Sequence, residues 1–244
     1  MLMITILWSF LVAAMGSEVQ ENNRTMALVP FKPHLTLATF HKKDRSLTFA
    51  GQTLTIYQDW NDGGVAAVLW DAAIILSRYL EQNKELVHQK RIIELGAGTG
   101  LVGMVAGLLG GRDVLITDRK SALSHTRLNI EENRKSGLQD SLQVKELVWG
   151  QDVSDLSPPF DVILGADIIY IEDTFNDLLR TLRDLSGKET IVLISCKIRY
   201  ERDSNFLKMM KQDFDINQVL YNKDLDITVY MAKRIFQKRE HSDL

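Results

Sequence analysis

Residues 94–103 run Glu-Leu-Gly-Ala-Gly-Thr-Gly-Leu-Val-Gly, and this stretch decides the fold class. A short apolar segment, Arg91 to Leu95, leads into the glycines, and small apolar residues from Leu101 to Leu109 follow them. That order predicts a buried strand, a tight turn and a helix. Glycines let the backbone of such a turn come close to a ligand, and the amides of the following helix point into the same space. The stretch therefore predicts a ligand-binding loop in an α/β fold.

Strand and helix patterns alternate on both sides of this loop. Upstream, the sequence predicts a hairpin over 47–57 and a helix over 65–79. Downstream, it predicts strands at 113–117, 142–147, 160–166 and 190–195, separated by helices at 122–133, 174–185 and 202–212. An antiparallel pair, 214–221 and 227–232, closes the chain. This order predicts a mainly parallel sheet with helices on both faces.

Composition narrows the class of protein. The chain has 244 residues, of which 45% are hydrophobic and 25% charged, values that suit one large globular domain. A formal net charge of −3, with acids and bases mixed, implies no broad basic surface, so nucleic acid is not the expected partner. The single cysteine, Cys196, excludes an intramolecular disulfide and is expected to be a small buried hydrophobe. One cysteine and five scattered histidines predict no metal site.

The first 25 residues differ from the rest. Met1 to Met15 is apolar, too short for a comfortable membrane span, and lacks the positive start of a signal peptide. Met26 offers a second start. We interpret residues 1–25 as a leader or alternative-start extension outside the fold, 26–234 as the domain and 235–244 as a charged tail. We expect a cytoplasmic protein without stable membrane association; a working signal peptide would instead direct it to the secretory pathway.

Two kinds of nucleoside cofactor fit residues 94–100, which we call the glycine loop. Gly98 to Gly103 matches G-x-G-x-x-G, the dinucleotide fingerprint, and Asp118 lies where an acid holds the ribose in either case. Glu94, however, precedes the first glycine and suits the ammonium and sulfonium groups of S-adenosylmethionine. No second domain remains for a dehydrogenase substrate. S-adenosylmethionine is therefore favoured over a dinucleotide, and a glycine turn without a ligand is the third alternative.

Eight motifs are spread along the chain. They are Asp59-Trp60, Val65-Ala67, Trp70-Ala72, Glu94-Gly103, Thr117-Arg119, Glu146-Gly150, Leu164-Tyr170 and Arg199-Asp203. Together, these motifs resemble those of the methyltransferase-like protein-lysine methyltransferases, which have a Rossmann-like, seven-strand class I fold. The resemblance extends from about Met26 to Arg234, and within the family it points to enzymes that methylate heat shock protein 70 chaperones.

The resemblance implies roles for residues near the glycine loop. Gly96, Ala97 and Gly98 would line the methionine part of the cofactor through their backbone. Asp118 would accept hydrogen bonds from both ribose hydroxyls. The purely structural alternative for Asp118 is a cap for the next helix, a role that is compatible with ribose binding.

Three further residues are assigned to the cofactor in the same way. Trp149 would pack near adenine, and Ala166 would contact the cofactor through its backbone at the end of the fourth strand. Trp70 would form a wall of the pocket from the long N-terminal helix. The alternatives are that Trp149 anchors its loop and that Trp70 packs in the core.

The segment Asp167-Ile-Ile-Tyr170 is the candidate acceptor site. Nucleobase amino-methyltransferases often carry two prolines between the acid or amide and the aromatic residue, and here both are isoleucine. This replacement favours an aliphatic amine as the acceptor. Asp167 is expected to accept a hydrogen bond from the amine, and Tyr170 to offer its ring to a cation. Alternatively, Asp167 caps the following helix and Tyr170 packs against it.

These observations predict an S-adenosylmethionine-dependent protein-lysine N-methyltransferase. The resemblance implies that a heat shock protein 70 chaperone is the substrate. We expect the enzyme to act as a monomer. Arg199 to Asp203 follows the fifth strand and is placed to touch that substrate. The alternatives are a small-molecule or nucleic-acid methyltransferase on the same fold, and a catalytically silent cofactor-binding module.

Overall fold

The computed structural model describes residues 39, 41–134, 138 and 142–236. The chain divides into two units, Met1–Pro33 and His34–Leu244, and every described residue belongs to the second. The expected leader, residues 1–25, lies outside the described residues, as does most of the expected tail. In the described part no single helix is long and apolar enough to cross a membrane. The bent pair Trp60–Ala67 and Asp71–Gln82 reaches that length and composition only together.

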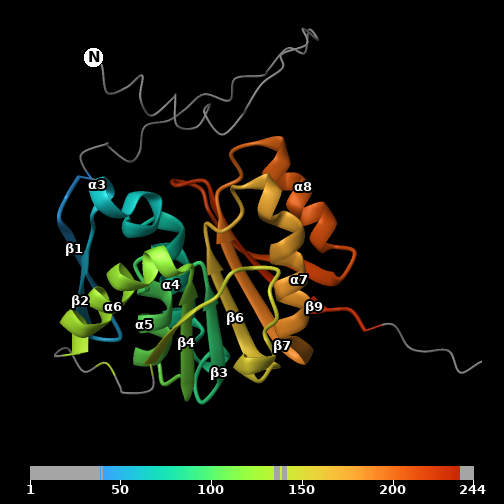
Figure 1. Cartoon of the computed structure of the whole chain (residues 1–244), viewed down its shortest axis with the longest axis horizontal. Coiled ribbons are helices and arrows are strands. Elements are labelled where there is room, and N and C mark those ends of the chain that lie inside the picture. The colour runs from blue at the N-terminus through green and yellow to red at the C-terminus, as the bar shows by residue number, and fades with distance from the viewer. Residues whose placement is uncertain (1–38, 40, 135–137, 139–141, 237–244) are drawn as a thin grey trace, which may run out of the picture. The chain divides into compact units, whose positions relative to one another are not determined.

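A seven-stranded sheet carries the fold (Figure 1). Its strand order is β5-β4-β3-β6-β7-β9-β8, in which the first five strands are parallel and β9 is antiparallel to both of its neighbours. This confirms the predicted α/β class and the closing antiparallel pair. The strands are β3 Arg91–Leu95, β4 Asp113–Asp118, β5 Leu142–Glu146, β6 Phe160–Ala166, β7 Ser186–Cys196, β8 Phe214–Asn222 and β9 Ile227–Arg234.

The strand order reverses between β3 and β6. From β3 the chain moves outward through β4 to β5, and it then returns to the other side of β3 for β6 and β7. Ligands of open α/β sheets bind outside the carboxyl ends of the strands at such a switch point. The glycine loop leaves the end of β3, and Asp167 leaves the end of β6, so both lie at this position.

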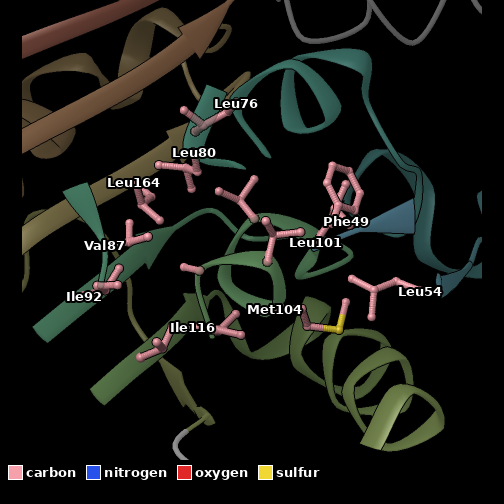
Figure 2. Packing of buried hydrophobic residues seen from close by; sticks show 14 of the residues in the cluster. Phe49, Leu54, Leu76, Leu80, Val87, Ile92, Leu101, Met104, Ile116 and Leu164 are labelled. Atoms are coloured by element: carbon pink, nitrogen blue, oxygen red, sulfur yellow. The ribbon is translucent and has the colours of Figure 1, made fainter. Parts of the chain in front are cut away.

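Helices cover both faces of the sheet (Figure 1). On one face lie α4 (Asp71–Gln82), α5 (Leu101–Leu108) and α6 (Lys120–Arg134), and on the other lie α7 (Phe175–Leu185) and α8 (Glu201–Met210). Because side chains alternate along a strand, Ile92 of β3 packs into the first core and its neighbour Ile93 into the second. Figure 2 shows the first core, where Leu101 and Met104 of α5 lie between the sheet and the N-terminal hairpin.

The expected helix over 65–79 is confirmed from Asp71 onwards and wrong before it. The structure instead has a short helix α3 (Trp60–Gly63), a 3₁₀ turn η1 (Gly64–Ala67) and then α4, with extended backbone at Val68 and Trp70. Gln58, which is buried, accepts the Leu69 N–H through its side chain at 3.0 Å. The carbonyl of Ala67 accepts the Asp59 N–H at 2.9 Å. These groups are therefore used across the turn and do not form helical hydrogen bonds.

The N-terminal hairpin consists of β1 (Asp44–Phe49) and β2 (Gln52–Tyr57), as predicted. On the edge of β2 that does not pair with β1, two asparagine side chains of α6 make the backbone hydrogen bonds that a neighbouring strand would otherwise make. The Asn133 amide accepts the Thr55 N–H and donates to the Thr55 carbonyl, both at 2.8 Å. Asn129 accepts the Tyr57 N–H at 2.8 Å and donates to the Tyr57 carbonyl at 3.3 Å. The hairpin is thus attached to the helix beside the glycine loop.

Candidate active site

The glycine loop is closely enclosed by other segments. Gly98 has a φ of +53°, and a β-carbon there would lie 2.8 Å from the carbonyl oxygen of Ala66, in η1. Gly96 has a φ of +59°, and a β-carbon there would lie 2.9 Å from Ile168 and 3.2 Å from the Trp149 ring. Only glycine combines this left-handed backbone with such close approach. The loop after β5 and the loop after β6 therefore converge on Gly96.

Asp118, at the end of β4, anchors this loop. Its Oδ2 accepts the Gly98 N–H at 2.8 Å, and its Oδ1 accepts the Arg119 N–H at 2.7 Å. The Ala97 N–H donates to the Thr117 carbonyl at 3.0 Å and adds a second link between the loop and β4. Because a carboxylate has about four acceptor positions, Asp118 retains capacity for two hydroxyl donors. These residues fit a cofactor with a ribose, and the ribose contact itself stays a prediction.

Asp118→Ala is expected to raise the dissociation constant for S-adenosylmethionine at least about tenfold, because hydrogen bonds to a charged acceptor are lost. The same change removes the acceptor of the Gly98 N–H and loosens the loop. Isothermal titration calorimetry measures the constant directly. The control is Asp113→Ala, at the opposite end of β4, where the carboxylate pairs with Arg91 at 3.3 Å. Equal affinities for wild type and Asp118→Ala would remove Asp118 from the cofactor site.

Glu94 lies beneath the loop and is almost fully buried. Its Oε2 accepts the N–H of Gly103, in the first turn of α5, at 2.8 Å. Burial raises the pKa of the Glu94 carboxyl to about 8; the Gly103 N–H opposes this shift and the charge of Asp118 adds to it. In this structure the carboxyl joins β3 to the start of α5. Its expected contact with the positive groups of the cofactor stays a prediction.

The raised pKa of Glu94 predicts a pH-dependent stability. The folded chain keeps a proton that the unfolded chain releases between its ordinary pKa of 4.5 and about 8. The free energy of unfolding should therefore fall as pH rises through this window. Glu94→Gln, which cannot ionise, should remove the Glu94 share of that decline. Urea unfolding at pH 5, 6, 7 and 8 measures it, and parallel curves for the two proteins would contradict the prediction.

The other predicted cofactor residues lie around the same end of the sheet. Trp149 packs on the second core and presents its ring to Gly96. Ala166 is the half-buried last residue of β6. Trp70 is expected inside the long N-terminal helix, but it lies directly before α4. There its indole N–H donates to the Val65 carbonyl at 2.9 Å. The turn described above places it there, and its contact with the cofactor stays a prediction.

Asp167 begins the acceptor segment. Its φ is +54°, a left-handed value that aspartate tolerates better than most residues, and its N–H donates to the Ser195 carbonyl at 2.7 Å. Its carboxylate is held by the guanidinium of Arg199 through two hydrogen bonds of 2.9 and 2.8 Å. It caps neither of the two helices that follow, whose capping positions are Ile171 and Thr174. The structural alternative for Asp167 is therefore not supported.

Tyr170 follows three residues later and is 39% exposed. Burial of part of the side chain raises the pKa of its hydroxyl, and the nearby charge of Arg119 opposes this rise. The phenol is therefore neutral at physiological pH.

Among the described residues, no group of three or more His, Cys, Asp or Glu side chains could hold a metal ion.

A model of the family described as "Lysine methyltransferase" matches residues 48–213. The chain belongs to the lysine methyltransferase family. It is 48% identical over 218 residues to the protein N-lysine methyltransferase METTL21A of Mus musculus, covering 88% of this chain and 100% of the relative. It is 39% identical over 197 residues to the EEF1A lysine methyltransferase 3 of Xenopus tropicalis, covering 80% and 87% of the two chains.

Solved structures agree with this family at the level of the fold. A magnesium protoporphyrin IX methyltransferase from Synechocystis with bound SAH matches with a TM-score of 0.51 and 12% identity, over 68% of this chain and 83% of that chain. A 16S rRNA N2 G1207 methyltransferase from T. thermophilus, in complex with AdoMet and guanosine, matches with a TM-score of 0.56 and 16% identity, over 79% and 50%. The comparisons confirm the predicted family and fold, and with them the S-adenosylmethionine-dependent class.

This lysine methyltransferase also contains site residues that the sequence analysis missed. Thr126 of α6 donates to the Gly98 carbonyl at 2.7 Å, and Asn129 of the same helix donates to the Thr99 carbonyl at 3.2 Å. Their spacing of three residues puts them on one face of the helix, and both are fully buried. The structure also pairs Arg199 with Asp167, a contact that the sequence analysis missed, and the expected substrate contact of the segment Arg199 to Asp203 stays a prediction. The positions of Asp167 and Arg199 after two neighbouring parallel strands were the available signal.

Proposed function

We propose that this chain transfers methyl groups from S-adenosylmethionine to a lysine side chain of a heat shock protein 70 chaperone, as a cytoplasmic monomer. One observation carries the proposal most: the carboxylate of Asp167 lies at the switch point beside the loop that Asp118 anchors. Family membership and relatives named as protein N-lysine methyltransferases support lysine as the acceptor. The chaperone class rests on the resemblance carried by the motifs.

The chain's own residues divide the work of binding and orientation. S-adenosylmethionine, when bound, supplies a methyl group on a sulfonium for in-line displacement. The backbone of Gly96 to Gly98 and the carboxylate of Asp118 would hold it at the end of β3. Trp149, whose ring faces Gly96, would cover one side and exclude water.

The acceptor amine must lose a proton before it attacks. With a reference pKa of about 10.4, only about one lysine in a few thousand is uncharged at neutral pH. Removal from water into a narrow site would lower the amine pKa. Asp167 would accept a hydrogen bond from the amine and direct its lone pair. The half-exposed Tyr170 ring would contact the nitrogen as it takes the positive charge from the sulfonium during transfer, a contact worth about 0.5–2 kcal/mol.

Labelled S-adenosylmethionine tests this function. The full chain is incubated with the labelled cofactor and a cell extract, and then with purified heat shock protein 70. Label on one chaperone band, located on a lysine by mass spectrometry, is the expected result. Label on RNA or on extractable small molecules would replace the proposal with another methyltransferase activity. Cofactor binding without any label would indicate a silent binding module. Asp118→Ala serves as the control for transfer that does not depend on the site.

A further inference from the structure

The pair formed by Asp167 and Arg199 joins the ends of two neighbouring parallel strands. Arg199 Nη1 donates to Asp167 Oδ1 at 2.9 Å, and Nη2 donates to Oδ2 at 2.8 Å. The Asp167 side chain is 9% exposed and that of Arg199 is 35% exposed. A planar guanidinium that binds both oxygens fixes the plane of the carboxylate, which a lysine at the same place would not do.

Each partner of this pair is also held through its backbone. The Asp167 N–H is bound by the Ser195 carbonyl. Asp203, buried in the first turn of α8, accepts the N–H groups of Arg199 and Tyr200 through one carboxylate oxygen, at 2.8 and 3.0 Å. The start of α8 therefore positions the arginine, and the end of β6 positions the aspartate. These backbone hydrogen bonds hold the Arg199 guanidinium against the Asp167 carboxylate.

Most charged side chains near the Asp167–Arg199 pair are themselves paired with a side chain of opposite charge. Asp71 of α4 lies near Asp167 and pairs with Arg45 of β1 at 3.7 Å. Burial raises the pKa of the Cys196 thiol to about 12, so this neighbour is neutral near physiological pH. Loss of the guanidinium would therefore leave Asp167 as an added negative charge. Among the other charged groups nearby, Asp203 acts on Arg199 and pairs with Arg202 at 3.7 Å, and Lys197, which lies near Asp71, pairs with Asp226 at 3.8 Å. Tyr170 lies near Asp167 and also near Asp118 and Arg119.

We propose that Arg199 is a positioning residue for methyl transfer, which orients the Asp167 carboxylate and offsets its charge where the acceptor amine enters. The proposal rests on the proposed function, because it concerns an amine acceptor. Each carboxylate oxygen keeps a second acceptor position beside its bond to Arg199, so the amine hydrogen bond remains possible.

The offset matters because the amine must be neutral to react. Even about 6 Å away, twice the length of a hydrogen bond, an unmatched carboxylate raises the amine pKa by about 2 at an effective dielectric constant of about 20, so the shift for a hydrogen-bonded amine is at least this large. That shift would lower the neutral fraction about a hundredfold at neutral pH. With the guanidinium in place, Asp167 accepts the hydrogen bond without holding the proton on the amine.

The test compares pH profiles of kcat for wild type, Arg199→Met and Arg199→Lys, at saturating S-adenosylmethionine, on a lysine of purified heat shock protein 70. Arg199→Met should lose about a hundredfold at pH 7, and its kcat should level off at a pH about 2 units higher than that of wild type. Arg199→Lys keeps the charge and should lose less at pH 7. The dissociation constant for S-adenosylmethionine should stay within about twofold in both, because no loop contact changes. Arg180→Met, on the exposed side of α7, controls for loss of one positive charge.

A kcat profile that levels off at the same pH as wild type, with the same loss throughout, would overturn the proposed charge offset, and unchanged activity at pH 7 would overturn the whole proposal. If Arg199→Met fails to fold, Arg199→Lys decides: a kcat profile identical to wild type rejects the oriented pair. Failure of the wild-type chain to methylate any protein lysine is a separate result, which would reject the proposed function.

Discussion

Asp167→Ala is expected to lower kcat for methyl transfer at least about a hundredfold, because misplacement of a reacting group has an effect of that size. The change removes the acceptor that would orient the amine. It also leaves the Arg199 guanidinium without its partner at the point where a cationic lysine approaches. Single-turnover transfer of label to the chaperone measures the effect.

Cofactor affinity should respond differently to the same change. The polar atoms of Asp167 bond to the Ser195 carbonyl and to Arg199, and neither belongs to the glycine loop. The dissociation constant for S-adenosylmethionine is therefore expected to stay within about threefold of wild type. Full activity in Asp167→Ala would remove Asp167 from the mechanism.

A second variant protects this prediction against misfolding. The left-handed backbone at position 167 costs an alanine roughly 1 kcal/mol, whereas asparagine tolerates it. Asp167→Asn therefore keeps the local fold, but its NH2 group cannot accept a hydrogen bond from Arg199, so the side chain is no longer held by two hydrogen bonds and most activity should be lost. Asp173→Ala changes an exposed acid in the same segment and should leave the rate unchanged.

The parallel strands could be predicted because their signal is local. Strands β3 and β6 begin and end at the residues that the sequence analysis gave, Arg91–Leu95 and Phe160–Ala166. Both are nearly continuous apolar runs, as expected for strands covered on two faces. The glycine loop was equally visible, because its residues are consecutive.

The features that the sequence analysis predicted wrongly or missed depend instead on contacts between distant parts of the chain. The expected helix over 65–79 has suitable periodicity, but Gln58 takes the Leu69 N–H from outside the segment, and no local pattern reports this. The Asp167–Arg199 pair spans 32 residues and depends on how the ends of β6 and β7 lie beside each other. Side chains that meet across the fold in this way require tertiary contacts that a single sequence does not contain.

The contact between α6 and the hairpin gives the second large prediction. Asn129→Ala is expected to lower the free energy of unfolding by about 3 kcal/mol, because it leaves buried polar groups without partners. The Tyr57 N–H loses its acceptor, and the Thr99 carbonyl loses the Asn129 donor. Chemical denaturation monitored by circular dichroism measures this loss.

Asn129→Ala should also weaken S-adenosylmethionine binding, whereas a purely structural contact remote from the loop would not. The lost bond to Thr99 lies within the glycine loop, between Gly98 and Gly100, so the loop becomes less ordered before the cofactor binds. Asn176→Ala, at an exposed position on α7, is the matched control and should change neither quantity. A destabilised Asn129→Ala protein with wild-type cofactor affinity would show that α6 supports the hairpin alone. If Asn129→Ala lowers both the free energy of unfolding and the affinity for S-adenosylmethionine, the same buried amide stabilises the N-terminal hairpin and the glycine loop.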